Sequence, residues 1–152
     1  MKACRAALIV AVSLLVTART HAGTTPYDTV KSAPAFAVGG VGYAGIKAQE
    51  ELAVLQICAG ADAEQQLRKL LQEASPAGQM YALFGLRQIE SPHYAALALP
   101  YRLRTDPVDR KSGCVGYSES MRESVEWIDH AFAKSPTSEK KHSAVSSAKQ
   151  QG

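Results

Sequence analysis

Acidic residues are missing from the first 22 positions, although three of the chain's 17 basic residues lie there. The rest of the chain therefore carries 14 basic and 14 acidic side chains and is neutral when histidine is uncharged. A neutral domain has no bulk positive charge with which to hold nucleic acid or an anionic membrane surface. Its length of about 130 residues supports one domain with a core, which excludes a two-domain cofactor enzyme.

Apolar runs long enough to span a bilayer are also missing. The run from Ala6 to Val16 covers 11 residues, whereas a spanning helix needs about 20. Lys2 and Arg5 precede this run and small residues follow it up to Ala22, which is the three-part pattern of a secretory signal peptide. We predict cleavage after Ala22, with Ala18 as the alternative. The mature protein is then periplasmic or secreted and has no stable membrane anchor.

Cysteine is scarce, and its three positions include no CxxC pair. Cys4 lies in the predicted signal peptide, so the exported chain retains Cys58 and Cys114. An even number of cysteines in an oxidising compartment favours one disulfide, which would close a loop of about 57 residues and stabilise the fold by roughly 4 kcal/mol. Two separately buried thiols, or a redox or metal pair, are the alternatives.

What is present is a series of apolar residues at helical spacing, punctuated by helix-start signals. Ser75-Pro76 and Ser91-Pro92 each combine an N-cap residue with a proline at the first helical position. Asp62 with Gln65 and Ser120 with Glu123 have the spacing of capping boxes. The helix that begins at Ser75-Pro76 is apolar nearly all round, so it is expected to be the central helix of the core. Short connections require antiparallel neighbours. We predict a mainly all-α fold of about five short helices packed as antiparallel hairpins and closed by one disulfide. The helices are expected at about 46–58, 62–74, 75–89, 92–103 and 120–134, with short extended segments near 35–43 and 110–117.

The apolar pattern also sets the predicted boundaries. Residues 1–22 form the signal peptide, and 23–34 form a flexible leader that lacks apolar periodicity. The helical domain covers 35–134. Residues 135–152 are rich in Ser, Lys and Gln, so they are predicted to be a disordered tail.

The segment from Gly40 to Gly45 reads Gly-Val-Gly-Tyr-Ala-Gly and matches the GxGxxG pattern of dinucleotide-binding loops. Gly40, Gly42 and Gly45 could allow a pyrophosphate to approach the backbone at a helix N-terminus. However, no strands alternate with the later helices to build a parallel sheet, and we predict no cofactor. A turn in which glycine adopts positive φ, or close backbone packing, is the favoured interpretation.

No motif supplies a strong catalytic or metal site. His130 lies four residues after Glu126 and seven after Glu123, a spacing that could form a weak metal patch but is more typical of a solvated helical face. Glu50 and Glu51 are adjacent on a helix and point about 100° apart, so they are interpreted as surface charge. HExxH and GxSxG motifs are absent, and we predict no enzyme.

Two further groups of residues are interpreted as surface features. Arg102, Arg104, Arg110 and Lys111 are interspersed with Asp106 and Asp109 and read as a mixed, solvated loop rather than a phosphate site. Four aromatic residues are candidates for interface anchors if they are exposed, namely Tyr94, Tyr101, Tyr117 and Trp127.

Three stretches carry a resemblance: Ala74 to Leu86, Phe36 to Gly45, and Ser112-Gly113-Cys114. With them, the chain from about Phe36 to Val115 resembles a group of small uncharacterised exported proteins of Gram-negative bacteria. That resemblance implies a periplasmic or secreted helical domain and supplies no catalytic residue. The helical hairpin is also similar to a HEAT-like unit, although one hairpin is too few for a solenoid.

These observations predict a non-enzymatic module that binds another protein, as an inhibitor or immunity-type factor does. The alternative is a small-ligand-binding protein or enzyme that uses the glycine-rich loop at 39–45. An exposed aromatic patch would favour the first hypothesis. A deep pocket that gathers Gly42, Tyr43 and Glu50 would favour the second.

Overall fold

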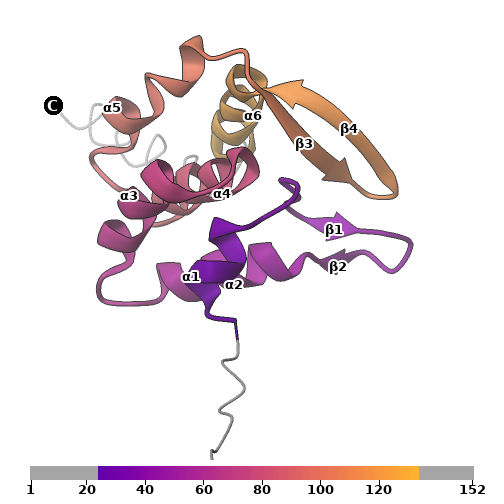
Figure 1. Cartoon of the computed structure of the whole chain (residues 1–152), viewed down its shortest axis with the longest axis horizontal. Coiled ribbons are helices and arrows are strands. Elements are labelled where there is room, and N and C mark those ends of the chain that lie inside the picture. The colour runs from indigo at the N-terminus through magenta and orange to yellow at the C-terminus, as the bar shows by residue number, and fades with distance from the viewer. Residues whose placement is uncertain (1–23, 134–152) are drawn as a thin grey trace, which may run out of the picture.

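Helices and strands both contribute to the fold of residues 24–133, the part of the chain that the computed structural model describes (Figure 1). The helices are α1 (Pro26–Lys31), α2 (Gln49–Cys58), α3 (Ala63–Glu73), α4 (Pro76–Gln88), α5 (Tyr94–Ala98) and α6 (Met121–Ala133), with a 3-10 turn η1 (Tyr101–Leu103). The strands are β1 (Gly40–Val41), β2 (Ile46–Lys47), β3 (Pro107–Ser112) and β4 (Val115–Ser120). The all-α prediction was therefore wrong, and the fold is mixed α and β.

The core is centred on α4, as the apolar sequence of this helix predicts. Ser75 caps its first turn by accepting a hydrogen bond from the Gly78 N–H at 3.1 Å. Met80, Leu83 and Leu86 are fully buried, and α2, α3 and α6 pack against the helix. These contacts confirm α4 as the central helix.

Of the two capping boxes predicted from the sequence, one forms and the other does not. At α6 the predicted capping box forms, because the Ser120 N–H donates to the Glu123 carboxylate at 2.7 Å and the Glu123 N–H donates to Ser120 Oγ at 3.3 Å. At α3 the Asp62 side chain makes no cap hydrogen bond and instead accepts from Gln66. The α3 capping box with Gln65 was therefore wrong, although the helix itself was expected.

The segment predicted as a flexible leader contains helix α1. Its apolar residue Val30 is fully buried, and Ser75 Oγ donates to the Ala33 carbonyl at 2.6 Å. Lys31 Nζ lies 2.9 Å from the Glu73 carboxylate on α3. The leader prediction was wrong because these contacts come from residues more than 40 positions away in the sequence. The predicted signal peptide and the predicted tail lie outside the described residues.

Two antiparallel hairpins lie on the same side of the molecule (Figure 1). β1 pairs with β2, and β3 pairs with β4 in continuous register from Pro107↔Ser120 to Ser112↔Val115. The chain around Phe36 runs along the other edge of β3, with Phe36 accepting from the Lys111 N–H at 3.0 Å. The segment 110–117, expected to be short and extended, is thus the greater part of a β-hairpin.

The predicted disulfide is not formed. Both Cys58, which is partly buried at the end of α2, and Cys114, which is exposed in the β3–β4 turn, are free thiols. Cys58 Sγ approaches the Gly85 carbonyl of α4 at 3.6 Å. The two cysteines lie on different elements, so the even number of cysteines was not sufficient ground for predicting a bridge.

Candidate functional site

The β1–β2 hairpin is shaped by glycines at positions where the backbone has positive φ. Gly39, Gly42 and Gly45 adopt φ of 94°, 70° and 61°, a region that side chains with a Cβ rarely enter. The Gly45 N–H closes the turn by donating to the Gly42 carbonyl at 3.2 Å. The glycine loop is therefore a conformational device, as the favoured interpretation predicted.

A buried carboxylate holds this hairpin to α2. Glu51 is only 3% exposed; it accepts a hydrogen bond from the Gly39 N–H at 2.8 Å, and its other oxygen lies 3.0 Å from Lys47 Nζ. Interpreting Glu51 as surface charge was wrong. Its backbone and lysine partners satisfy a charge whose burial would otherwise be costly.

The β3–β4 hairpin has an anchor of its own. Arg110, only 6% exposed, donates to the Glu119 carboxylate at 2.8 Å, and Ser124 Oγ donates to the same oxygen at 2.6 Å. The Arg110 guanidinium lies 4.0 Å from the centre of the Trp127 ring, within the range of a cation–π contact. Arg110 was wrongly assigned to a solvated loop, because the pairing that buries it was not predicted.

The two hairpins are joined at their ends. The Gly42 N–H donates to the Gly113 carbonyl at 2.8 Å, and Val41 forms a parallel bridge with Gly113. The β1–β2 hairpin is thus fixed to α2 through Glu51, and the β3–β4 hairpin is fixed to α6 through the contacts of Glu119 with Ser124 and of Arg110 with Trp127. Backbone pairing joins the two hairpins to each other. We call residues 40–47 and 112–118 together the hairpin surface.

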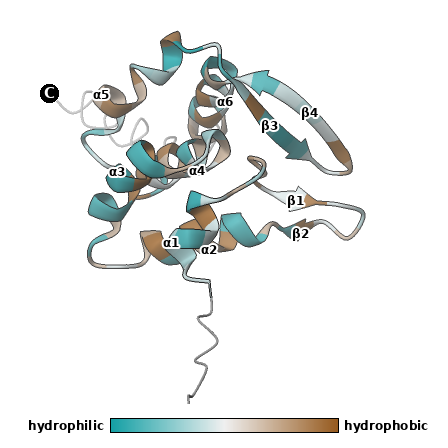
Figure 2. Ribbon diagram, in the orientation of Figure 1, coloured by the Kyte–Doolittle hydropathy of each residue, from teal (hydrophilic) through white to brown (hydrophobic). Residues whose placement is uncertain are grey.

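Apolar side chains are exposed on this surface. Of the seven exposed large apolar residues in the described chain, four lie here: Tyr43, Ile46, Val115 and Tyr117. Tyr43 is fully exposed, and Ile46 and Val115 are 67% and 63% exposed. Figure 2 shows apolar segments on both hairpins, away from the helices. Single exposed apolar residues are ordinary, but their gathering on two linked turns is typical of an interaction surface.

The four predicted interface residues differ in exposure. Tyr94 is buried and donates to Asp129 at 2.8 Å, and Tyr101 is buried and donates to the Leu71 carbonyl at 2.9 Å. Trp127 is partly buried beneath Arg110 and against Phe36. Only Tyr117 is exposed. Sequence reasoning missed Tyr43 as an interface residue, although a tyrosine within a glycine turn has few neighbours to cover it.

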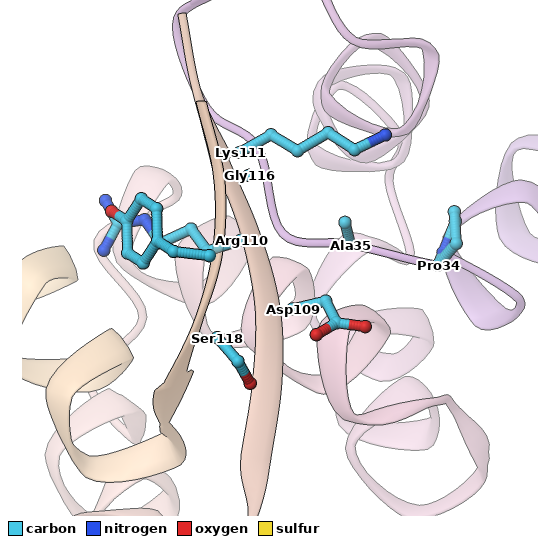
Figure 3. A pocket seen from close by; sticks show the side chains of 8 residues that line it. Pro34, Ala35, Asp109, Arg110, Lys111, Gly116 and Ser118 are labelled. Atoms are coloured by element: carbon cyan, nitrogen blue, oxygen red, sulfur yellow. The ribbon is translucent and has the colours of Figure 1, made fainter. Parts of the chain in front are cut away.

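Two cavities of about 470 Å³ each open on the described surface. The first lies between Pro34-Ala35 and the β3–β4 hairpin, and Figure 3 shows Asp109 and Lys111 extending to the side of Ala35 while Arg110 extends to the opposite side. The second lies between α3 and the α5–η1 segment. Gly40, Gly42 and Gly45 line neither cavity.

The glycine loop also has few free donors for an anion. The N–H groups of Gly39, Gly42 and Gly45 donate to Glu51, Gly113 and Gly42 respectively. Helix α2 begins only at Gln49, after strand β2. The pocket that would gather Gly42, Tyr43 and Glu50 is not among the two cavities, so this geometry gives the ligand-site alternative no support.

Metal-ligating side chains do not form a cluster in residues 24–133. No group of three or more His, Cys, Asp or Glu side chains there is close enough to hold a metal ion, and His130 belongs to no such group. Burial raises the pKa of the Cys58 thiol to about 11, which disfavours the nucleophilic thiolate. None of the helices in this part of the chain is long and apolar enough to cross a bilayer.

Comparison with protein-family models, curated proteins and solved structures found no match. The fold and the site define an α+β domain that presents two anchored β-hairpins on one side of its helices.

Proposed function

We propose that this protein is an exported, non-enzymatic binding module that docks another protein through its hairpin surface. The observation that carries the proposal is the exposure of Tyr43, Ile46, Val115 and Tyr117 on two hairpins that contacts with α2 and α6 hold in place. An anchored surface loses little conformational freedom on binding, and tyrosine contributes a large contact area with few rotatable bonds.

The helical part of the molecule has a different role in this proposal. The apolar faces of the helices pack in the core around α4. The helices therefore position the hairpins, whose exposed side chains remain available to the partner. Export is proposed from the signal-peptide pattern of residues 1–22 alone. The periplasm or the exterior is then where the partner is to be sought.

The test is photo-crosslinking in the native cell envelope, with a photoreactive phenylalanine analogue placed at Tyr43 or at Ile46. A discrete product of defined mass is expected at both positions. The matched control is Leu103, an apolar residue that is 80% exposed but lies in η1, outside the hairpin surface. The same product at Leu103, or none at Tyr43 and Ile46, would contradict the proposal.

Substitution then tests whether the apolar side chains supply the affinity. Tyr43→Ser combined with Ile46→Ser should abolish capture of the crosslinked partner while leaving the melting temperature unchanged, because both side chains are exposed. Leu103→Ser should retain the partner. Loss of one interface anchor commonly costs about 1 to 4 kcal/mol, or roughly fivefold to a thousandfold in affinity.

A further inference from the structure

Within residues 24–133, strand β4 has an unpaired outer edge. The Phe36 N–H donates to the Asp109 carbonyl and the Lys111 N–H donates to the Phe36 carbonyl, so these β3 groups point away from β4. In an antiparallel ladder, the backbone N–H and C=O groups of alternate residues point to opposite edges of the strand. The backbone groups of Val108, Arg110 and Ser112 therefore point toward β4, where their partners are Glu119, Tyr117 and Val115. The backbone groups of Gly116 and Ser118 consequently point outward, and within residues 24–133 they have no partner.

This edge lacks the features by which proteins usually protect an open strand. The stretch Val115-Gly116-Tyr117-Ser118 contains no charge and no proline, and it pairs with β3 without a bulge. All four residues are exposed, and Figure 1 shows β4 as the outermost strand on its side of the described fold. An uncharged, unbulged and exposed edge is a template for another strand.

We infer that the strand which fills this edge is β4 of a second copy, paired antiparallel about a two-fold axis at Tyr117. In that register Gly116 of each copy lies opposite Ser118 of the other. Their outward N–H and C=O groups form two reciprocal pairs of hydrogen bonds. Tyr117 lies opposite its own counterpart in a non-hydrogen-bonded pair, where cross-strand side chains are closest and aromatic pairs are stabilising.

Charge complementarity favours a second copy as the occupant. Lys111 is opposite Gly116 and Asp109 is opposite Ser118 within one hairpin. In the two-fold register, Gly116 of one copy lies opposite Ser118 of the other. One row across the four strands therefore runs from Lys111 to Gly116 of the first copy and continues with Ser118 and Asp109 of the second copy. Neither Lys111 nor Asp109 has an ion-pair partner in the described part of one copy. The row places opposite charges at its two ends, with only glycine and serine between them.

This inference goes beyond the proposed function and is tested separately from it, because Tyr43 and Ile46, the two positions probed for the partner protein, lie outside β4. The dimer would use the β4 part of each hairpin surface for the contact between copies and would present two copies of Tyr43 and Ile46 to a partner. It would therefore add avidity to any binding of the partner protein.

The first test is the molar mass of the full chain by light scattering, from about 1 µM to about 1 mM, which spans moderate to weak affinities. The mass is expected to double across this range. Ser118→Pro removes one outward N–H while sparing the β3–β4 ladder, so this variant should remain monomeric with an unchanged melting temperature. Ser118→Thr keeps the N–H and should dimerise as the parent does. A parent that stays monomeric, or a folded Ser118→Pro variant that still dimerises, would overturn the inference.

The second test measures the register by oxidative crosslinking in a Cys58→Ala, Cys114→Ser background. Tyr117→Cys should form an intermolecular disulfide readily, because residues in a non-hydrogen-bonded pair have Cα atoms about 4.5 Å apart. Val115→Cys is the matched control. Its counterpart would lie four residues along the strand, about 14 Å away, beyond the reach of a disulfide. Equal crosslinking at both positions, or crosslinking at Val115 alone, would overturn the register.

Discussion

At the residue scale, environment decides the role of each charged side chain. Glu51 and Arg110 both read as surface residues in sequence, yet both are buried with partners that neutralise them. A buried charge is tolerated only when it is paired and hydrogen-bonded. Glu51 therefore ties the β1–β2 hairpin to α2, and Arg110 joins β3 to β4 and packs over Trp127 of α6.

Arg110→Ala should lower the free energy of unfolding by about 3 kcal/mol, because it leaves the mostly covered Glu119 carboxylate, 13% exposed, without its cation. The measurement is urea unfolding followed by circular dichroism. Lys111→Ala is the control, since Lys111 is the exposed neighbour in the same strand and its loss should change stability by no more than about 0.5 kcal/mol. Equal effects of the two substitutions would contradict a buried ion pair.

The two free cysteines should differ sharply in reactivity. At pH 8 Cys114 should be alkylated quickly because it is exposed, whereas Cys58 should react slowly because burial raises its pKa to about 11 and keeps the thiol protonated. Raising the pH towards that pKa should accelerate the reaction of Cys58. Mass spectrometry of alkylated protein measures both rates, and the unfolded chain provides the control in which the difference disappears. Unreduced protein without any alkylatable thiol would contradict the structure.

At the element scale, the docking of α1 on α4 depends on a residue without a side chain. A Cβ atom at Gly78 would overlap the Val30 carbonyl oxygen of α1 and would lie 2.8 Å from the Ala74 Cβ. Backbone atoms cannot move aside as a flexible side chain can. Gly78 therefore sets how closely these two helices approach.

Gly78→Ala should destabilise the protein by about 1 to 3 kcal/mol, the usual cost of overpacking. A loss of stability would be informative, because a Gly→Ala substitution in an exposed helix usually stabilises the protein by up to about 1 kcal/mol. Thermal unfolding provides the measurement, and Gln72→Ala at an exposed site on α3 is the control. A Gly78→Ala variant more stable than the parent would show that α1 does not pack as described.

On the scale of the whole molecule, the N-terminal segment completes the core. Val30 and Phe36 are fully buried, and the Tyr81 hydroxyl of α4 both donates to and accepts from the Ala37 backbone, at 2.8 and 2.9 Å. Residues 26–38 thus connect the helical core to β3. The chain folds as one unit in which the hairpins and the helices share this segment.

A chain that begins at Pro34 should therefore melt at a clearly lower temperature than one that begins at Gly23, because it lacks the buried Val30 and the Lys31–Glu73 contact. Removal of one fully buried aliphatic side chain alone costs about 2 to 5 kcal/mol. Circular dichroism at increasing temperature measures the difference. Equal melting temperatures would restore the flexible-leader interpretation that the structure contradicts.

Features whose causes are local could be predicted from the sequence. Ser75-Pro76 begins α4, Ser120 and Glu123 form the cap of α6, and three of the four glycines in the 39–45 loop have positive φ. Each depends on residues a few positions apart, so the energetic preference is recognisable without knowing the fold. The apolar pattern of α4 likewise identified the centre of the core.

The remaining features required the tertiary structure, because their partners are distant in sequence. Val30 contacts α4, Tyr101 bonds to Leu71, and the segment around Phe36 pairs with β3. No pattern of neighbouring residues in the sequence indicates these contacts. The candidate site belongs to this second group. Its exposed side chains became visible only when the pairing of Gly42 with Gly113 joined the two hairpins, since exposure is a property of what the folded neighbours fail to cover.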